Sequence, residues 1–235
     1  GSGSTLLIRS SSFTNNGSVN SSNLEFDTTT SVSGTGTFTP ANILIISSGN
    51  VSLANNLSFS PTAGLTINGG GVLNPNTFTL TLSTPSFTLN NGATVSNSGL
   101  FQTQGIILMN IKNGSNFNVP FKVNSGTNTA YDNGSPFTAI FNGPVTIDAS
   151  ATLSCVAGGY FIRFNNTISN NGTLTSGGGS TINFYGINFT NNGIVNPSVF
   201  NFQTGAHTLQ GTGSWLTNAN ILTGSTVTLT SNHQM

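Results

Sequence analysis

A short motif constrains the fold of this chain more than any other feature: an apolar residue, a hydroxyl residue, Asn-Asn-Gly, any residue and a second apolar residue. It is present at three places and in a looser form at a fourth: Phe13–Val19, Ile168–Leu174, Phe189–Val195 and Val95–Phe101. Since Asn-Gly permits a positive φ at a sharp corner, we predict corners at Asn16, Gly17, Asn171, Gly172, Asn192 and Gly193. Stacked Asn side chains at such corners are expected to form hydrogen-bonded ladders.

Between the corners, apolar and polar residues alternate over short stretches such as Leu65–Ile67, Phe78–Leu82 and Val145–Ile147. Val, Ile, Phe and Thr favour strands, and a period of two is the strand period. No stretch shows the i, i+3, i+4 apolar pattern of a helix, and Gly, Asn, Ser and Thr are poor helix formers. The pattern predicts an all-β chain of very short strands.

The spacing of the motif indicates how these strands are arranged. Gly172 and Gly193 lie 21 residues apart, which fits one coil of a right-handed parallel β-solenoid (β-helix) with about 20 residues per coil and about 11 to 12 coils. A β-sandwich or jelly roll is the alternative, because it also has short strands and Gly-rich turns. The repeated corners, the coil-like spacing and the lack of charge on the strands favour the solenoid.

A longer similarity relates the two ends of the chain. Gly34–Leu44 resembles Gly211–Leu222, and the apolar residues that follow have matching spacings. If a second copy follows Met235, its Leu6 continues the apolar register of Leu229 without a gap. We therefore predict one solenoid domain over 1–235, with repeat modules over about 13–71 and over 189–235 continued by 1–12 of a neighbouring copy.

The terminal segments show no capping helix, Lys-rich edge or Pro block, although a monomeric solenoid needs protected ends. The sequence thus predicts head-to-tail association of copies, or of neighbouring repeats in a longer chain. The residues expected at this interface are Leu6, Leu7, Ile8, Val227, Leu229 and Met235.

Composition narrows the function classes. Charged residues make up 3% of the chain and the formal net charge is zero, so no basic surface is expected for nucleic acid. No apolar run reaches the length needed to span a bilayer, which argues against membrane insertion. The 17 Phe and 35% hydrophobic residues argue against disorder. The absence of a signal-peptide pattern predicts a mature form or an excised segment.

Residues for catalysis are too scattered to predict an enzyme, a catalytic residue, a metal site or a cofactor. Polysaccharide-active β-helices need clustered carboxylates, whereas the one close acidic pair is Glu25 and Asp27. This pair fits a solvated strand surface better than a weak Ca²⁺ site. His207 and His233 lack a partner at ligand spacing. Cys155 is predicted to be a small buried hydrophobe.

Threonines alternate along Thr77–Thr81 and Thr226–Thr230. Such rows on a flat face suit an ice lattice or a crystalline polysaccharide, but Thr is also a favoured outward residue of any strand. Trp215 takes the place of Phe38 in the repeat, so we expect it in the core and not on a sugar-stacking surface.

In its Phe-Thr-Asn-Asn-Gly-x-Val, Gly-Thr-Gly-x-Phe and Ala-Asn-Ile-Leu motifs the chain resembles the repeats of secreted bacterial surface proteins. These are the filamentous-haemagglutinin-like and autotransporter-passenger β-helices and the repetitive surface proteins of Bacteroidota-type bacteria. The resemblance implies a structural protein of the bacterial cell surface or extracellular space, a fibre or stalk with an adhesion or biofilm role and contacts with glycans or host surfaces. The alternatives are a monomeric glycan- or ice-binding solenoid and a polysaccharide-active β-helix enzyme.

Overall fold

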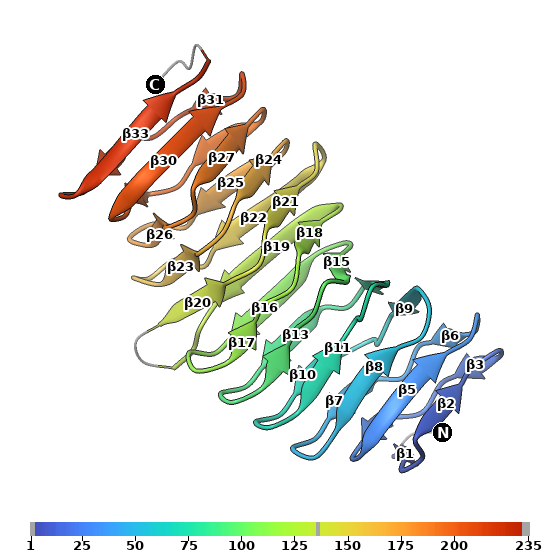
Figure 1. Cartoon of the computed structure of the whole chain (residues 1–235). Coiled ribbons are helices and arrows are strands. Elements are labelled where there is room, and N and C mark those ends of the chain that lie inside the picture. The colour runs from blue at the N-terminus through green and yellow to red at the C-terminus, as the bar shows by residue number, and fades with distance from the viewer. Residues whose placement is uncertain (1–2, 135–136, 232–235) are drawn as a thin grey trace.

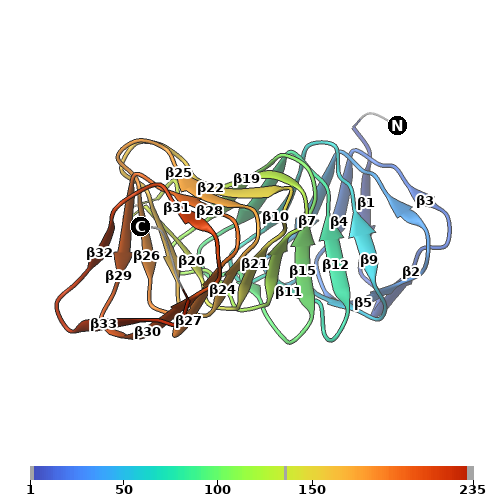
Figure 2. The ribbon, with the colours of Figure 1, turned by 90° about the horizontal axis from the view of Figure 1, so that it is seen from above.

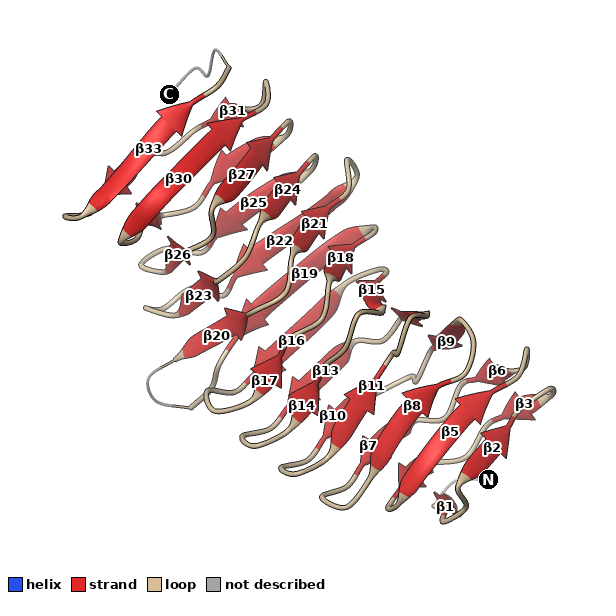
Figure 3. Ribbon diagram, viewed as in Figure 1, coloured by secondary structure: helices blue, strands red, loops and turns tan. Residues whose placement is uncertain are grey.

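The computed structural model describes residues 3–134 and 137–231, which form a parallel β-solenoid of eleven coils. The coils stack along one long axis, with the two chain ends at opposite ends of the stack (Figure 1, Figure 2). Register partners on successive coils are separated by 18 residues at Thr5 and Asn23 and by 25 at Thr127 and Thr152. The solenoid prediction is confirmed, and the sandwich alternative is excluded because the described strands pair in parallel. No helix among the described residues is long and apolar enough to cross a membrane (Figure 3).

Each coil places one strand on each of three faces. Face 1 is a continuous sheet of eleven strands. In order they are β1 (Thr5–Ile8), β4 (Asn23–Phe26), β7 (Asn42–Ile45), β10 (Gly64–Ile67), β13 (Ser86–Leu89), β16 (Ile107–Ile111), β19 (Gly126–Tyr131), β22 (Ala151–Cys155), β25 (Thr173–Ser176), β28 (Ile194–Asn196) and β31 (Ser214–Trp215).

Face 2 is divided into two sheets. The N-terminal sheet holds β2 (Ser12–Thr14), β5 (Thr29–Ser33), β8 (Asn50–Leu53), β11 (Val72–Asn74), β14 (Thr94–Val95) and β17 (Asn116–Phe117). The C-terminal sheet holds β20 (Thr138–Phe141), β23 (Phe161–Phe164), β26 (Thr181–Phe184), β29 (Val199–Phe202) and β32 (Ala219–Ile221). The break between β17 and β20 falls where the coil is longest, since 25 residues separate Thr127 from its partner Thr152.

Face 3 is again a continuous sheet of eleven strands. They are β3 (Ser18–Val19), β6 (Thr37–Phe38), β9 (Leu57–Phe59), β12 (Thr79–Leu82), β15 (Leu100–Thr103), β18 (Phe121–Val123), β21 (Val145–Ile147), β24 (Ile168–Asn170), β27 (Asn188–Asn191), β30 (Gly205–Gln210) and β33 (Ser225–Leu229).

The core follows from the period-two pattern. On β4, for example, Leu24 and Phe26 are fully buried while Asn23 and Glu25 lie on the outer side. Because coils stack in register, inward rings of successive coils meet, as Phe38 and Phe59 do at 5.1 Å between centroids. Trp215 is 6% exposed and contacts Phe200 at 5.2 Å between centroids, so its predicted core position is confirmed.

The corner glycines are needed for a reason other than the predicted one. Positive φ angles are absent at Gly17, Gly172 and Gly193, so that part of the prediction is wrong. Instead, a side chain on Gly193 would collide with the carbonyl oxygen of Gly172 on the preceding coil, and one on Gly172 would collide with that of Ala151. Gly172 and Gly193 are therefore required by the close approach of backbones on successive coils, whereas nothing lies within 4 Å of a side chain added at Gly17.

The sequence similarity between the two ends corresponds to a shared corner geometry on different edges of the solenoid. Phe13–Val19 turns from β2 on face 2 to β3 on face 3, whereas Phe189–Val195 turns from β27 on face 3 to β28 on face 1. Phe38 and Trp215 both point inward, but from face 3 and face 1 respectively. The joint at Met235 lies outside the described residues.

We expect Gly193→Ala to lower the free energy of unfolding by about 1–3 kcal/mol, because the added methyl group has to displace the Gly172 carbonyl. Gly178→Ala is the matched control: its φ is not positive and nothing lies within 4 Å of the added carbon, so we expect a change within about 0.5 kcal/mol. Chemical denaturation measures both. Equal stabilities of the two variants would contradict the close-approach explanation.

Candidate functional site

The second Asn of each corner motif lies on the outside and stacks on the next coil. Asn192 donates from Nδ2 to Oδ1 of Asn171 at 3.0 Å, and Asn16 accepts the backbone N–H of Thr35 at 3.3 Å. Similar amide ladders run elsewhere, as where Asn220 donates to Asn201 and Asn201 to Asn183. The ladders expected at the corners are present, and they tie neighbouring coils together on the surface.

The first Asn of the motif points inward, which sequence reasoning missed. Asn191 is fully buried and accepts from Asn170 at 2.8 Å and from the Gly193 N–H at 3.3 Å, while its Nδ2 donates to the Ser214 carbonyl. Asn15 makes the same two backbone contacts, with Gly17 N–H and Thr37 carbonyl. The signal was available: the first Asn follows the inward apolar residue by two positions and so has inward parity.

At the N-terminal end, the three predicted interface residues of β1 point to different sides of the strand, two toward the core and one toward the outer surface. Leu6 and Ile8 pair with the inward Leu24 and Phe26 and so lie at the end of the core, with Leu6 39% exposed. Leu7 pairs with Glu25 and lies on the outer surface. The side chains of Leu6 and Ile8 are therefore placed to meet the core of a further coil, and that of Leu7 lies on its outer side.

At the C-terminal end, the last coil leaves its core open. Leu229 is 46% exposed, Val227 is half-buried, and Met235 lies outside the described residues. A small apolar hollow of about 30 Å³ is lined by Phe202, Leu209, Trp215, Ala219, Ile221 and Val227. The indole Nε1–H of Trp215 is buried there without a hydrogen-bond partner. This end exposes apolar surface that the interior coils cover with the next coil.

The three aspartates that the structure describes form ion pairs or accept hydrogen bonds. Asp27 accepts from Arg9 Nε at 2.6 Å, and Glu25 lies half-buried on the outer side of β4. Asp148 pairs with Lys122 at 2.8 Å. Asp132 is fully buried and accepts from the backbone N–H groups of Asn113 and Gly134 at 2.7 and 2.8 Å.

The structure describes one of the two histidines, His207, and it lies among backbone carbonyl groups. His207 is buried, and its Nδ1 and Nε2 lie 2.7 and 2.6 Å from the carbonyl oxygens of Gly186 and Gln203. Both ring nitrogens thus face backbone groups. Over the described ranges no three His, Cys, Asp or Glu side chains gather in one place, and His233 lies outside those ranges.

Face 3 carries the hydroxyl groups that the threonine rows suggested. Register partners place a file of outward residues along it: Ser18, Thr37, Ser58, Thr81, Gln102, Lys122, Thr146, Ser169 and Thr190. Seven of these nine residues are Ser or Thr, and unequal coil lengths conceal this alignment in the sequence. The Lys122–Asp148 ion pair interrupts the file near its middle.

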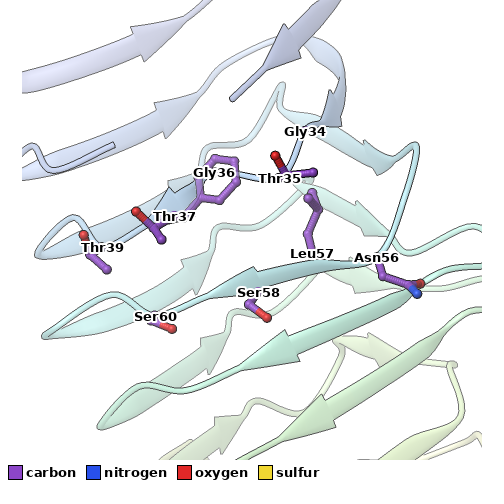
Figure 4. A pocket seen from close by; sticks show the side chains of 10 residues that line it. Gly34, Thr35, Gly36, Thr37, Thr39, Asn56, Leu57, Ser58 and Ser60 are labelled. Atoms are coloured by element: carbon purple, nitrogen blue, oxygen red, sulfur yellow. The ribbon is translucent and has the colours of Figure 1, made fainter. Parts of the chain in front are cut away.

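A shallow groove of about 300 Å³ lies on this face between β6 and β9, where a single residue pair, Phe38 and Phe59, joins the strands. Thr37, Thr39, Ser58 and Ser60 line it (Figure 4). Its lining residues offer hydroxyl and amide groups but no carboxylate, imidazole or amine. The groove can therefore hydrogen-bond a polar molecule, and its side chains supply no acid or base.

The geometry defines the class of this protein: a parallel β-solenoid with amide ladders at its corners and an open apolar core at its C-terminal end. Comparisons with protein-family models, with curated proteins and with solved structures find no match for this chain.

We expect Asn191→Ala to destabilise the protein by about 1–3 kcal/mol, because the buried Asn170 amide loses one of its two hydrogen bonds and the Ser214 carbonyl loses its bond to Asn191. Asn192→Ala, one residue away on the outside of the same corner, is expected to cost about 0.5 kcal/mol or less. Chemical denaturation of both variants tests this difference. A larger loss for Asn192→Ala would show that the surface ladder dominates.

Cys155 is 1% exposed, as its predicted role as a buried hydrophobe requires. Burial raises the pKa of its thiol to about 11, and a hydrogen bond with Ser180 opposes this in part. A raised pKa means less thiolate, so at pH 8 we expect alkylation by iodoacetamide at least about 100-fold slower in the folded protein than in denaturant. Mass spectrometry of the modified chain measures the rates, and similar rates in both states would contradict the buried placement.

Proposed function

We propose that this protein is a structural, non-enzymatic solenoid that builds a fibre or long surface stalk by head-to-tail stacking of its coils. The observation that supports the proposal most directly is the empty space beside Gly17. Nothing lies within 4 Å of where a side chain on Gly17 would stand, although Gly36, stacked on it in the next coil, would collide with the Gly17 carbonyl. Gly193 and Gly213 are likewise required by the coil that precedes them.

In the later coils, the preceding coil leaves room only for glycine at this corner. Gly17 is also a glycine, although no described coil of this chain precedes it. The C-terminal end of a second copy supplies the missing coil. Gly17 lies at the corner between faces 2 and 3, and the equivalent corner of the last coil lies between β32 and β33. A carbonyl from that corner would fill the space that Gly17 leaves.

The side chains at the two ends support the same arrangement. The C-terminal end exposes Ile221 and Leu229 beside the hollow that Trp215 lines, and the N-terminal end exposes Leu6 and the partly buried Phe13. Inward residues of the two ends would meet on each face, β31 against β1, β32 against β2 and β33 against β3. Burying this surface stabilises the contact through the hydrophobic effect, and parallel pairing satisfies the free strand edges.

The near absence of charge fits a protein whose coils assemble by backbone pairing. With a formal net charge of zero, repulsion between copies is minimal. A position on the bacterial surface or outside the cell, with a role in adhesion or biofilm, is proposed on the resemblance of the corner motifs to secreted β-helical surface proteins.

The test compares filament formation by the wild type, Gly17→Ala and Gly178→Ala. We expect filaments of the 24.1 kDa subunit for the wild type and for Gly178→Ala in negative-stain electron microscopy. For Gly17→Ala we expect monomers of unchanged melting temperature, because the added methyl group meets nothing within one copy. Discrete rods from the wild type at all concentrations would contradict self-assembly. Filaments of Gly17→Ala as long as those of the wild type would contradict the proposed register.

A further inference from the structure

The outer surface of face 2 changes character at the break between β17 and β20. Before the break its outward residues are mainly hydroxyl and amide residues, such as Ser31 and Ser52 in one register file. After the break, aromatic rings gather on and beside β20 and β23. We call this group the ring patch: Tyr131, Phe137, Tyr160, Phe161 and Tyr185. It contains all three tyrosines of the chain.

Three of the rings contact one another beside the start of β23. Tyr160 lies 6.2 Å from Tyr131 and 5.5 Å from Phe137 between ring centroids, both edge to face. Phe161 follows Tyr160, and Tyr185 lies at the far end of β23, beside Arg163. Phe137, Phe161 and Tyr185 are 36–44% exposed. The exposed rings therefore lie at the two ends of β23, with Phe137 and Phe161 at its start and Tyr185 beyond its end.

The backbone at one end of the patch is strained to hold a ring outward. Phe137 has a φ of 61°, a conformation that is costly for a bulky residue and concentrates at functional sites. Its N–H donates to the Gly134 carbonyl at 2.8 Å, and the Gly134 N–H donates to the buried Asp132. Burial and, to a lesser extent, the neighbouring Tyr160 raise the pKa of the Tyr131 hydroxyl above its ordinary value.

At the other end of the ring patch, contacts with a ring and an amide hold Arg163 in place, and no carboxylate among the described residues pairs with it. Its guanidinium lies 4.1 Å from the centroid of the Tyr185 ring, and its Nε donates to Asn165 at 2.6 Å. Arg9 and Lys122 form ion pairs with carboxylates, whereas Arg163 forms none within residues 3–134 and 137–231. A guanidinium held flat by a ring and one amide keeps its terminal nitrogens free to bind a carboxylate in bidentate fashion.

A row of amides adjoins this guanidinium. Asn183, Asn201 and Asn220 follow Arg163 in one register file across β26, β29 and β32. These amides bond one another in a ladder, at 3.0 Å from Asn201 to Asn183 and at 2.9 Å from Asn220 to Asn201. Each amide nitrogen has a second N–H, which can donate to a hydroxyl group of an extended polar chain. Rings, a free guanidinium and a row of amides are therefore presented together on one lateral face, which end-to-end stacking leaves exposed.

We propose that the ring patch, Arg163 and the adjoining amides form a binding site for an acidic polysaccharide that contains uronic acid residues. The rings offer apolar faces to the carbon-bound hydrogens of the sugars, and Arg163 pairs with a carboxylate. The amides bond sugar hydroxyls. Nucleic acid is disfavoured as the ligand, because one guanidinium neutralises one phosphate and a duplex needs many such contacts.

The test is calorimetric titration of the full chain with hexagalacturonate, with its methyl ester as the matched ligand that lacks the carboxylates. We expect saturable binding of hexagalacturonate and binding of the ester at least about tenfold weaker, because a charged, bidentate contact is lost. No saturation at millimolar hexagalacturonate would overturn the proposal. Equal affinity for the ester would overturn recognition of an acidic sugar.

Variants locate the site. We expect Arg163→Gln and Tyr185→Ala each to weaken hexagalacturonate binding by about fivefold or more, while Tyr185→Phe, which keeps the ring, stays within about twofold of the wild type. Arg9→Gln is the matched control, since it removes the other arginine at a distant, ion-paired position. Equal losses for Arg9→Gln and Arg163→Gln would overturn the proposal in favour of non-specific charge attraction. A wild-type dimer that Tyr185→Ala abolishes would overturn it in favour of lateral contact between copies.

Discussion

The backbone ladder between successive coils is the interaction on which the rest of this structure depends. Each strand pairs in parallel with the strand one coil away, so the N–H and C=O groups of a coil are satisfied by its two neighbours. This stacking brings like residues together, which makes the ring contacts of the core and the amide ladders of the surface possible. Among the described residues, the first and last coils each have a neighbouring coil on one side, and the proposed assembly would supply the other.

The corners show how a chain almost without charge maintains that ladder. The amide of Asn191 lies inside and hydrogen-bonds backbone groups of two coils. The amide of Asn192 lies outside and bonds Asn171. Gly193 then removes the side chain that would hold the coils apart. The three residues of the motif thus have three separate roles. Gly17 also lacks a side chain, although no described coil approaches it. This links the corner chemistry to the function we propose.

The two proposed functions occupy different surfaces. Stacking uses the ends of the solenoid, where Leu6 and Trp215 lie, and glycan binding uses the lateral ring patch around Arg163. A fibre would therefore repeat the ring patch once per copy along its length. Because each site binds through few contacts, such repetition would raise the affinity for a long polysaccharide through multivalency.

The sequence by itself determined the all-β class, the coil length, the corner positions and the burial of Trp215 and Cys155, because strand alternation and Asn-Gly corners are local signals. It did not reveal why the corner glycines are needed, since Gly172 and Gly193 meet only after the coils stack. The ring patch was equally hidden: Tyr131 and Tyr160 are distant in the chain, and their rings meet only because successive coils stack. The tertiary structure decided these points, because contacts between coils depend on the summed lengths of all intervening turns.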